Sequence, residues 1–279
     1  MTVDLDSPAY SARVIRTRHV SAHMVRVTVN DIRAEHGGPP PAPGGPGDEF
    51  FGLWIPTPDG RPVKRYYTAR AWRPETGELD VDLLLHGHGP ATEWAARAAV
   101  GDVVGFDEPR GHYRPPADTE WIVLSGDATA LPAIGRILEE RDATAPPVPV
   151  TVVIALDDAA DRQQLPVSSI DTLIWVRPDE LVSRTRALVQ TPGTGYVWFS
   201  GEASDMRAVR ALLRRELRWP TSRWMTMGYW RRDSEAWDAR YRAAGAQLHE
   251  RLAEVFASEQ DEQLQLDHAE ELLRAEGLL

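Results

Sequence analysis

The sequence predicts an antiparallel β-barrel, followed by a doubly wound parallel α/β domain and then a helical extension at the C-terminus. Three observations lead to this fold class. Over residues 12–106, apolar and polar residues alternate in short runs, as they do in strands with one buried face. From Trp121 onward, continuous apolar runs take turns with helical segments, which is typical of a parallel sheet covered on both faces. Residues 234–279 have helical periodicity.

The chain has 279 residues, enough for two domains of ordinary size. The change of pattern falls near Pro115-Pro116, which we take as the domain boundary. We therefore expect a barrel domain over residues 1–116, an α/β domain over residues 117–232 and the helical extension over residues 233–279.

Six strands are expected in the barrel domain, from short runs with alternating polarity. They cover residues 13–19, 25–29, 50–56, 64–70, 79–86 and 103–106. A loop rich in Gly and Pro over residues 36–47 separates the second strand from the third, and a turn over residues 57–60 precedes the fourth.

In the α/β domain, strands and helices alternate, so the sheet is expected to be parallel with right-handed crossovers. The strands cover residues 121–125, 150–156, 173–176, 196–200 and 224–229. The helices cover residues 131–141, 180–189 and 203–218. In the extension, an apolar stripe is expected to dock on the body of the protein, formed by Trp237, Tyr241, Leu248, Leu252 and Val255.

The composition restricts the function. The chain contains no cysteine, which excludes disulfides, thiolate metal sites and protein-bound iron–sulfur clusters, so redox chemistry would depend on a bound cofactor. The formal charge is −11 and no basic run stands clear of acidic neighbours, so no nucleic-acid partner is expected. The first residues do not resemble a signal peptide, and no apolar run approaches the ~20 residues that span a bilayer. We expect a cytoplasmic protein without membrane insertion.

One short strand-like run combines cations, aromatic rings and a hydroxyl: Lys64-Arg65-Tyr66-Tyr67-Thr68-Ala69-Arg70. Because side chains alternate along a strand, Arg65 and Tyr67 share one face while Tyr66 and Thr68 share the other. A flavin dinucleotide needs a guanidinium for its pyrophosphate, a flat ring for its isoalloxazine and a hydrogen-bonding group near its N5 atom. An ordinary barrel strand with solvated arginines is the alternative interpretation.

A glycine-rich turn over residues 86–95 leads from the fifth strand into a short helix. Free amide groups at a helix start, two glycines and the hydroxyl of Thr92 could hold a pyrophosphate. A plain strand-to-helix turn capped by Thr92 explains the pattern equally well. His86 and His88 could form a metal pair, but no third ligand has suitable spacing, so no metal site is expected.

Two loops follow predicted parallel strands at their carboxyl ends, where such sheets bind ligands. Residues 126–132 follow the first strand and residues 201–204 follow a later one, and each loop opens a helix. Side by side they would form a crevice for a dinucleotide, although the first is not a Gly-x-Gly-x-x-Gly loop.

Several motifs in a fixed order, within about residues 10–232, resemble those of the siderophore-interacting proteins. This family is the branch of the ferredoxin-reductase superfamily that reduces iron held in siderophores. The motifs are Arg65-x-Tyr67-Thr68-x-Arg70, His86-x-x-Gly89-Pro90-Ala91-x-x-Trp94-Ala95, residues 121–132, Gly201-Glu202-Ala203 and Gly228-Tyr229-Trp230-Arg231.

The resemblance implies an FAD-binding barrel and an α/β domain that binds NADH or NADPH. Arg65 would hold the FAD phosphates, Tyr67 would pack on the isoalloxazine and Thr68 would meet its N5 side. The ribityl and pyrophosphate path would be lined by His86, Gly89, Ala91 and Thr92. The nicotinamide dinucleotide would be bordered by Asp127, Thr129, Ala130 and Glu202. Near the flavin would lie Tyr229 and Trp230.

Two positions depart from the family pattern. Ala128 stands where the family usually has glutamate, which leaves the dinucleotide contact at that loop open. Asp233 stands where the family usually has glycine, which leaves the turn into the extension open.

The resemblance implies an NAD(P)H-dependent flavin oxidoreductase that passes electrons through FAD to Fe(III) in a siderophore, without a catalytic acid or base. Since ferric siderophores are often anionic, we expect Lys64, Arg231 and Arg232 to form a positive patch that binds the substrate. A general flavin or ferric-chelate reductase and a siderophore-binding accessory flavoprotein are the alternatives. The sequence leaves open the choice of NADH or NADPH, the siderophore, and whether the protein is a monomer or a weak dimer.

Overall fold

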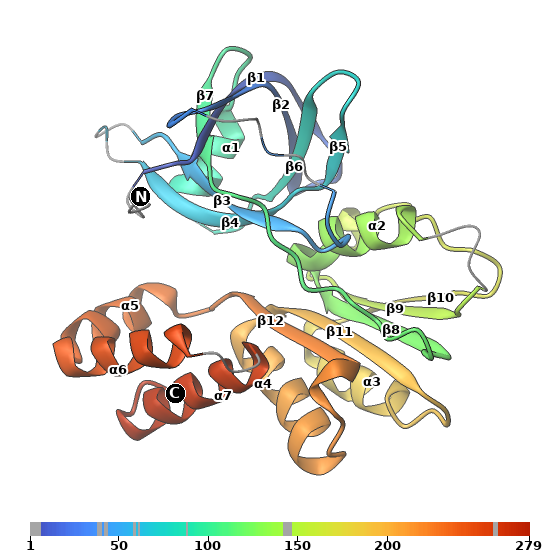
Figure 1. The fold of residues 1–279 in the computed structure, drawn as a ribbon. Coiled ribbons are helices and arrows are strands. Elements are labelled where there is room, and N and C mark those ends of the chain that lie inside the picture. The colour runs from blue at the N-terminus through green and yellow to red at the C-terminus, as the bar shows by residue number, and fades with distance from the viewer. Residues whose placement is uncertain are drawn as a thin grey trace.

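The computed structural model describes residues 7–37, 41, 44–57, 60, 62–87, 89–141, 147–258 and 262–279. A curved antiparallel sheet is followed by a parallel sheet flanked by helices and then by a helical extension (Figure 1), which confirms the predicted fold class. Residues 1–6, His88 and parts of the expected loop and turn over residues 36–47 and 57–60 lie outside the described residues. Within the described residues, every helix is too short or too polar to cross a membrane.

The first sheet is an antiparallel half-barrel. In spatial order its described strands are β4 (Val63–Thr68), β3 (Phe50–Ile55), β7 (Val103–Phe106), β1 (Tyr10–His19), β2 (Met24–Ala34), β6 (Glu78–Leu84) and β5 (Ala71–Arg73). Alternate residues, such as Val25, Val27 and Val29 on β2, pack in one core with Trp94 of α1 (Pro90–Arg97). The three-residue strand β5 was not expected, because so short a run has no recognisable period.

Strand β4 ends at Thr68, two residues earlier than expected. The amide of Ala69 still donates to the carbonyl of Glu49 at 2.8 Å, but the next amide, of Arg70, donates to the carbonyl of Asp80 on β6 at 2.9 Å, so the chain leaves the ladder with β3 there. The guanidinium of Arg70 forms two hydrogen bonds of 2.6 Å with the carboxylate of Glu139, which belongs to the second domain.

The second sheet is parallel. In spatial order its strands are β10 (Thr172–Val176), β9 (Val150–Ala155), β8 (Trp121–Asp127), β11 (Gly195–Glu202) and β12 (Trp224–Trp230). The helix α2 (Leu131–Glu139) packs in the core on one face, and α3 (Leu181–Leu188) and α4 (Ala203–Ala211) pack in the core on the other. Because the chain leaves β8 toward β9 and later returns to β11 on the other side of β8, the carboxyl ends of β8 and β11 meet where such sheets bind ligands.

At its end, α4 widens into a π-helical turn, η4 (Leu212–Glu216), where a regular helix was expected. The amide of Leu217 donates to the carbonyl of Leu212, five residues back, at 2.9 Å. The wide turn holds one residue more than an α-helical turn does.

Buried polar contacts join the two domains, and α2 lies between the half-barrel and the parallel sheet (Figure 1). The guanidinium of Arg136 on α2 donates to the carbonyl of Ala69 at 2.7 Å and to the carboxylate of Glu49 at 3.1 Å. Trp198 on β11 donates through Nε1 to the carboxylate of Asp48 at 2.9 Å. These bonds fix the half-barrel relative to the parallel sheet.

The C-terminal extension consists of α5 (Ser234–Ala243), α6 (Ala246–Ala257) and α7 (Glu262–Ala275). The expected apolar stripe packs within the extension rather than on the body, because Leu248 and Leu252 form a separate buried cluster with Ala269 and Leu278. The helix α7 thus supplies the apolar surface that α6 needs, which the sequence pattern of α6 could not show.

Ion pairs connect the extension to the α/β domain. Arg210 on α4 donates to Glu270 on α7 at 2.8 Å, and Arg214 in η4 pairs with Asp267 on α7. The extension is therefore attached to the body through charged side chains of α7.

Candidate functional site

Strand β4 carries the residues expected to hold a flavin, and its register with β3 fixes the direction in which they point. Tyr67 lies opposite Phe51, a residue of the half-barrel core, and is itself half-buried against that core. Burial raises the pKa of Tyr67 to about 12, although the Arg65 guanidinium opposes the shift. The side chain of Arg65 is exposed and donates to the carbonyl of Lys64 at 2.8 Å. The guanidinium is thus open to a ligand, while the contact between Tyr67 and a flavin stays a prediction.

The opposite face of β4 presents Tyr66 and Thr68. Thr68 is directed toward the α/β domain, where its hydroxyl lies near that of Tyr229 on β12. Burial raises the pKa of the Tyr229 phenol, and the hydroxyls of Ser200 and Thr68 partly offset the rise. Tyr66 is 59% exposed, with its ring set edge-on to that of Phe50 at 5.9 Å. Tyr66, which the motif did not single out, therefore offers more free aromatic surface than Tyr67.

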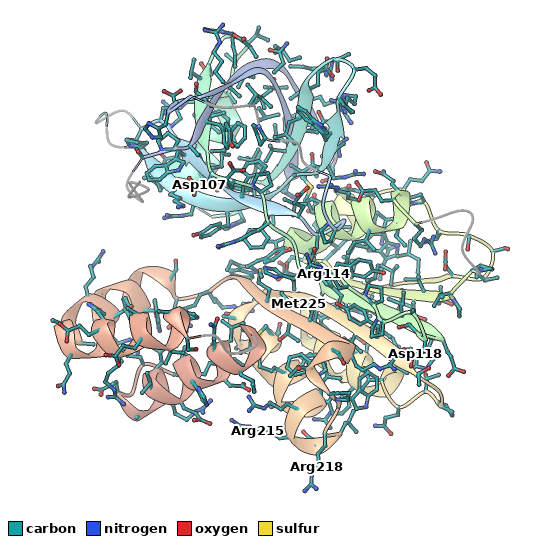
Figure 2. The ribbon with its side chains drawn as sticks, in the orientation of Figure 1. Asp107, Arg114, Asp118, Arg215, Arg218 and Met225 are labelled. Atoms are coloured by element: carbon teal, nitrogen blue, oxygen red, sulfur yellow. The ribbon has the colours of Figure 1, made fainter. Side chains whose placement is uncertain are left out.

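Two of the three cations of the expected substrate patch line the same pocket. Lys64 pairs with Asp107, at the edge of the half-barrel in Figure 2, and its Nζ atom lies 5.1 Å from the ring centroid of Trp54. Arg231 and Arg232 follow β12 and line a pocket whose described lining does not include Lys64.

The turn after β6 keeps its backbone amides accessible. Gly87 and Gly89 have φ angles of 56° and 142°, and a Cβ atom added at either would meet no described atom within 4 Å. Gly89 is the N-cap of α1 and no side chain caps the helix, since the hydroxyl of Thr92 donates to the carbonyl of His86 at 3.2 Å. Thr92 is therefore not the cap, and Ala91 lies in the first turn of a helix whose start has no side-chain cap, with the acidic Glu93 in the same turn.

Asp127, at the carboxyl end of β8, connects three strands. One carboxylate oxygen accepts from the amide of Thr129 at 2.9 Å and from its hydroxyl at 2.5 Å. The other accepts from the amide of Glu202 at 2.9 Å and from the indole Nε1 of Trp230 at 2.7 Å. Burial raises the pKa of Asp127, and these hydrogen bonds partly offset the rise. With both oxygens engaged, Asp127 positions β8, β11 and β12 relative to one another.

Glu202 lies in the second of the two loops predicted to border a dinucleotide, and it is the N-cap of α4. Its carboxylate accepts from the amide of Ser204 at 2.6 Å and from the amide of Arg232 at 3.3 Å. Although burial acts in the opposite direction, the hydrogen bonds from Ser204 lower the pKa of Glu202. Glu202 therefore joins the start of α4 to the chain that leaves β12.

Residues of both domains meet beside this edge of the sheet. The imidazole of His86, from the half-barrel, lies 6.0 Å from the ring of Trp230, from β12. Together with Thr68 and Tyr229, this pair places four of the predicted positions at the junction of the domains. Thr129 and Ala130 lie in the short helical turn after β8, with Ala130 buried.

The two departures from the family pattern have different structural settings. Asp233 has a φ angle of −108°, which any residue adopts, so the turn into α5 does not require glycine. Ala128 opens the turn after β8 and packs against the core beneath α2, so its methyl group offers no polar contact to a ligand.

Sequence reasoning missed Asp48, which is 3% exposed and accepts from the amides of His112 and Tyr113 at 2.8 Å and from Trp198. Its role depends on contacts between distant segments, so no local pattern marks it. Among the described residues, no three His, Asp or Glu side chains are grouped as metal ligands.

A half-barrel followed by a parallel sheet is the fold of the ferredoxin-reductase-like proteins, and the chain superimposes on phthalate dioxygenase reductase with a TM-score of 0.57 at 13% identity. Residues 32–113 match the siderophore-interacting FAD-binding domain, and residues 119–233 match the siderophore-interacting protein family. The chain belongs to the siderophore-interacting protein family and is an FAD-binding protein.

Three similar proteins illustrate the relationship. Ferric vibriobactin reductase ViuB of Vibrio cholerae is 29% identical over 184 residues, which are 63% of this chain and 67% of that protein. The uncharacterized protein Rv2895c of Mycobacterium tuberculosis is 30% identical over 266 residues, covering 81% of this chain and 91% of that protein. The siderophore-interacting protein SipS from Aeromonas hydrophila superimposes with a TM-score of 0.67 at 26% identity, covering 85% of this chain and 98% of that chain.

Proposed function

We propose that this protein is an FAD-dependent ferric-siderophore reductase, which passes electrons from NADH or NADPH to Fe(III) and releases iron as Fe(II) in the cytoplasm. The observation that carries the proposal is the meeting of the two domains. Thr68 and His86 of the half-barrel lie beside Tyr229 and Trp230, at the edge where the parallel sheet is expected to bind a dinucleotide. The similarity to a ferric vibriobactin reductase supports the choice of substrate class.

The residues present fit FAD. Arg65 has an exposed guanidinium, and the start of α1 has open amides beside two glycines with room around them. Bound FAD would supply the conversion between a two-electron hydride donor and a one-electron acceptor. Arg65 would hold the phosphates together with the turn formed by His86, Gly89, Ala91 and Thr92.

The α/β domain would orient the donor. Asp127 holds Trp230 and the start of α4 in place, and Thr129, Ala130 and Glu202 border the mouth between β8 and β11. Tyr229 and Trp230 would exclude water on the side facing the half-barrel. No proton transfer from a side chain is required, because Fe(II) binds hard oxygen donors less strongly than Fe(III) and leaves the chelate after reduction.

Anaerobic stopped-flow spectroscopy of the FAD-loaded protein tests the proposal. We expect NADH or NADPH to bleach the flavin spectrum and an anionic ferric siderophore to restore it, with Fe(II) trapped by a colorimetric chelator. Bleaching without reoxidation by any ferric siderophore, but with reoxidation by simpler ferric chelates, would favour a general ferric-chelate reductase. Failure of both nucleotides to bleach the flavin would leave an accessory flavoprotein.

The positions of the domain boundaries also remain proposals. We propose that residues 1–116, 117–232 and 233–279 form the FAD-binding, nucleotide-binding and extension units. Lys64, Arg231 and Arg232 remain the proposed substrate cations, although only the last two share a pocket.

A further inference from the structure

A pocket of about 380 Å³ lies between the start of α4, the end of β12 and the C-terminal extension. Six charged side chains line it: Arg207, Arg231, Arg232, Arg240, Glu202 and Asp233. Counted over side chains, four guanidinium groups stand against two carboxylates, a positive excess, although the whole chain has a formal charge of −11.

The cations of this pocket are largely uncompensated within the described part of the chain. No described carboxylate forms an ion pair with Arg207, Arg231 or Arg232, and the pair between Arg240 and Asp233 is 3.4 Å long and exposed. Burial and the neighbouring Arg207 lower the pKa of Arg231, and the charges of Asp233 and Glu202 offset this only in part, so like charges are held together at a cost in free energy. An anion that enters the pocket would remove this repulsion.

The acidic groups compete weakly with such an anion. Glu202 already accepts hydrogen bonds from Ser204 and Arg232, which engage its carboxylate at the edge of the pocket. The guanidinium of Arg231 lies over the ring of Trp237 at 4.5 Å, so its planar donors are held in one orientation. Trp237 in turn donates through Nε1 to the carbonyl of Leu278 at 3.0 Å.

The extension is therefore part of the pocket. Arg240, from α5, and residues 277–279 line the pocket, and Trp237 of α5 packs against the guanidinium of Arg231. Arg231 directly follows Trp230, whose indole is held by Asp127 and lies 6.0 Å from His86. The pocket thus lies next to the proposed redox site, but on the β12 side of Glu202, whereas the fold places a nicotinamide dinucleotide between β8 and β11.

We propose that this pocket binds the ferric substrate as an anionic chelate, with Arg207 and Arg240 as binding residues and the extension as part of the acceptor site. The inference rests on the proposed reductase function. It assigns donor and acceptor to neighbouring but separate places, and it adds to Arg231 and Arg232 two arginines of the same pocket that the sequence did not mark. Guanidinium groups suit the paired oxygens of catecholate or carboxylate donors.

Binding can be tested without electron transfer, using the redox-inert Ga(III) tris(catecholate) complex and the FAD-loaded protein. We expect the double variant Arg207→Gln/Arg240→Gln to raise the Kd of this trianion at least about tenfold, and we expect the difference to shrink in high salt. The matched control is Arg215→Gln/Arg218→Gln, which removes two exposed arginines outside the pocket (Figure 2) and should leave the Kd unchanged.

Half-reactions separate this inference from the proposed function. If the pocket serves the acceptor, the double variant reduces its flavin with NADH or NADPH at the wild-type rate, and only its reoxidation by the ferric trianion slows. If the double variant binds and reduces the chelate as well as the wild-type protein does, the pocket is not the acceptor site, while the proposed reductase function stands. A slower flavin reduction by NADPH alone would assign the pocket to the donor and likewise overturn the inference.

If wild-type protein fails to reduce any ferric chelate, the proposed function fails. Circular dichroism and the Tm of each variant verify folding.

Discussion

At the scale of single residues, Asp127 shows how one carboxylate can connect three segments of the chain. Its two oxygens accept four hydrogen bonds, and the partners belong to the turn after β8, to β11 and to β12. The motif predicted Asp127 as a cofactor contact, but its spacing could not show that Trp230, more than a hundred residues later, would occupy one oxygen.

Replacing Asp127 by Asn should destabilise the protein by about 1–3 kcal/mol, because the amide nitrogen cannot accept from the Trp230 indole or the Glu202 amide. Urea unfolding measures the loss. Trp230→Phe removes a single bond and should cost less. Equal stability of Asp127→Asn and wild type would show that the carboxylate has no organising role.

The contact between His23 and Asp161 predicts a dependence on pH. The hydrogen bond and the charge of Asp161 raise the pKa of His23, and Asp161 also accepts from the amide of His23 at 2.8 Å. Because the folded-state pKa lies above the unfolded value of about 6.5, the stabilisation is complete below that pH. It is lost as the pH rises through the folded-state pKa.

Urea unfolding of wild type and His23→Gln between pH 5.5 and pH 9 checks this dependence. We expect the two proteins to differ most at the acidic end and to converge as the pH rises. The exposed His19, at the end of β1, provides the control variant His19→Gln. A constant difference across the range would exclude the titration of His23 as its cause.

At the scale of elements, β4 agrees with the alternation read from its sequence, since Tyr66 and Tyr67 lie on opposite faces. What alternation could not supply is the environment of each face. The core of the half-barrel receives Tyr67, while Tyr66 stays exposed beside Phe50. The strand β5 and the π-helical turn η4 were not predicted either. The first is too short to show the alternation of a strand, and the second has the composition of an ordinary helix.

For β4, we expect Arg65→Gln to raise the Kd for FAD by about tenfold or more, since a charge-assisted phosphate contact would be lost. Fluorescence titration of the apoprotein with FAD measures the change. Arg33→Gln, on β2, removes an exposed arginine paired with Asp31 and should leave the affinity unchanged. Equal affinities of wild type and Arg65→Gln would remove Arg65 from the FAD site.

At the scale of the whole molecule, function depends on how α2 joins the domains. The motifs marked Thr68, His86, Tyr229 and Trp230 separately, but their meeting depends on Arg136, which is 2% exposed and bridges to Glu49 and Ala69. No periodicity reveals such a contact between domains.

Replacing Arg136 by Met should destabilise the protein by about 3–5 kcal/mol, because Glu49 would remain buried without its partner. The double variant Arg136→Met/Glu49→Gln removes the unpaired charge and should recover part of the loss. Urea unfolding followed by tryptophan fluorescence measures both. A loss below about 1 kcal/mol would mean that other contacts hold the domains together.

The π-helical turn η4 predicts a structural difference between members of the family. An α-helix turns by about 100° for each residue, so deleting one residue there would rotate the remaining residues of this helix by that angle. Arg214 would then point away from Asp267, and α7 would lose an anchor. We expect homologous chains without α7 to have a regular helix at this place.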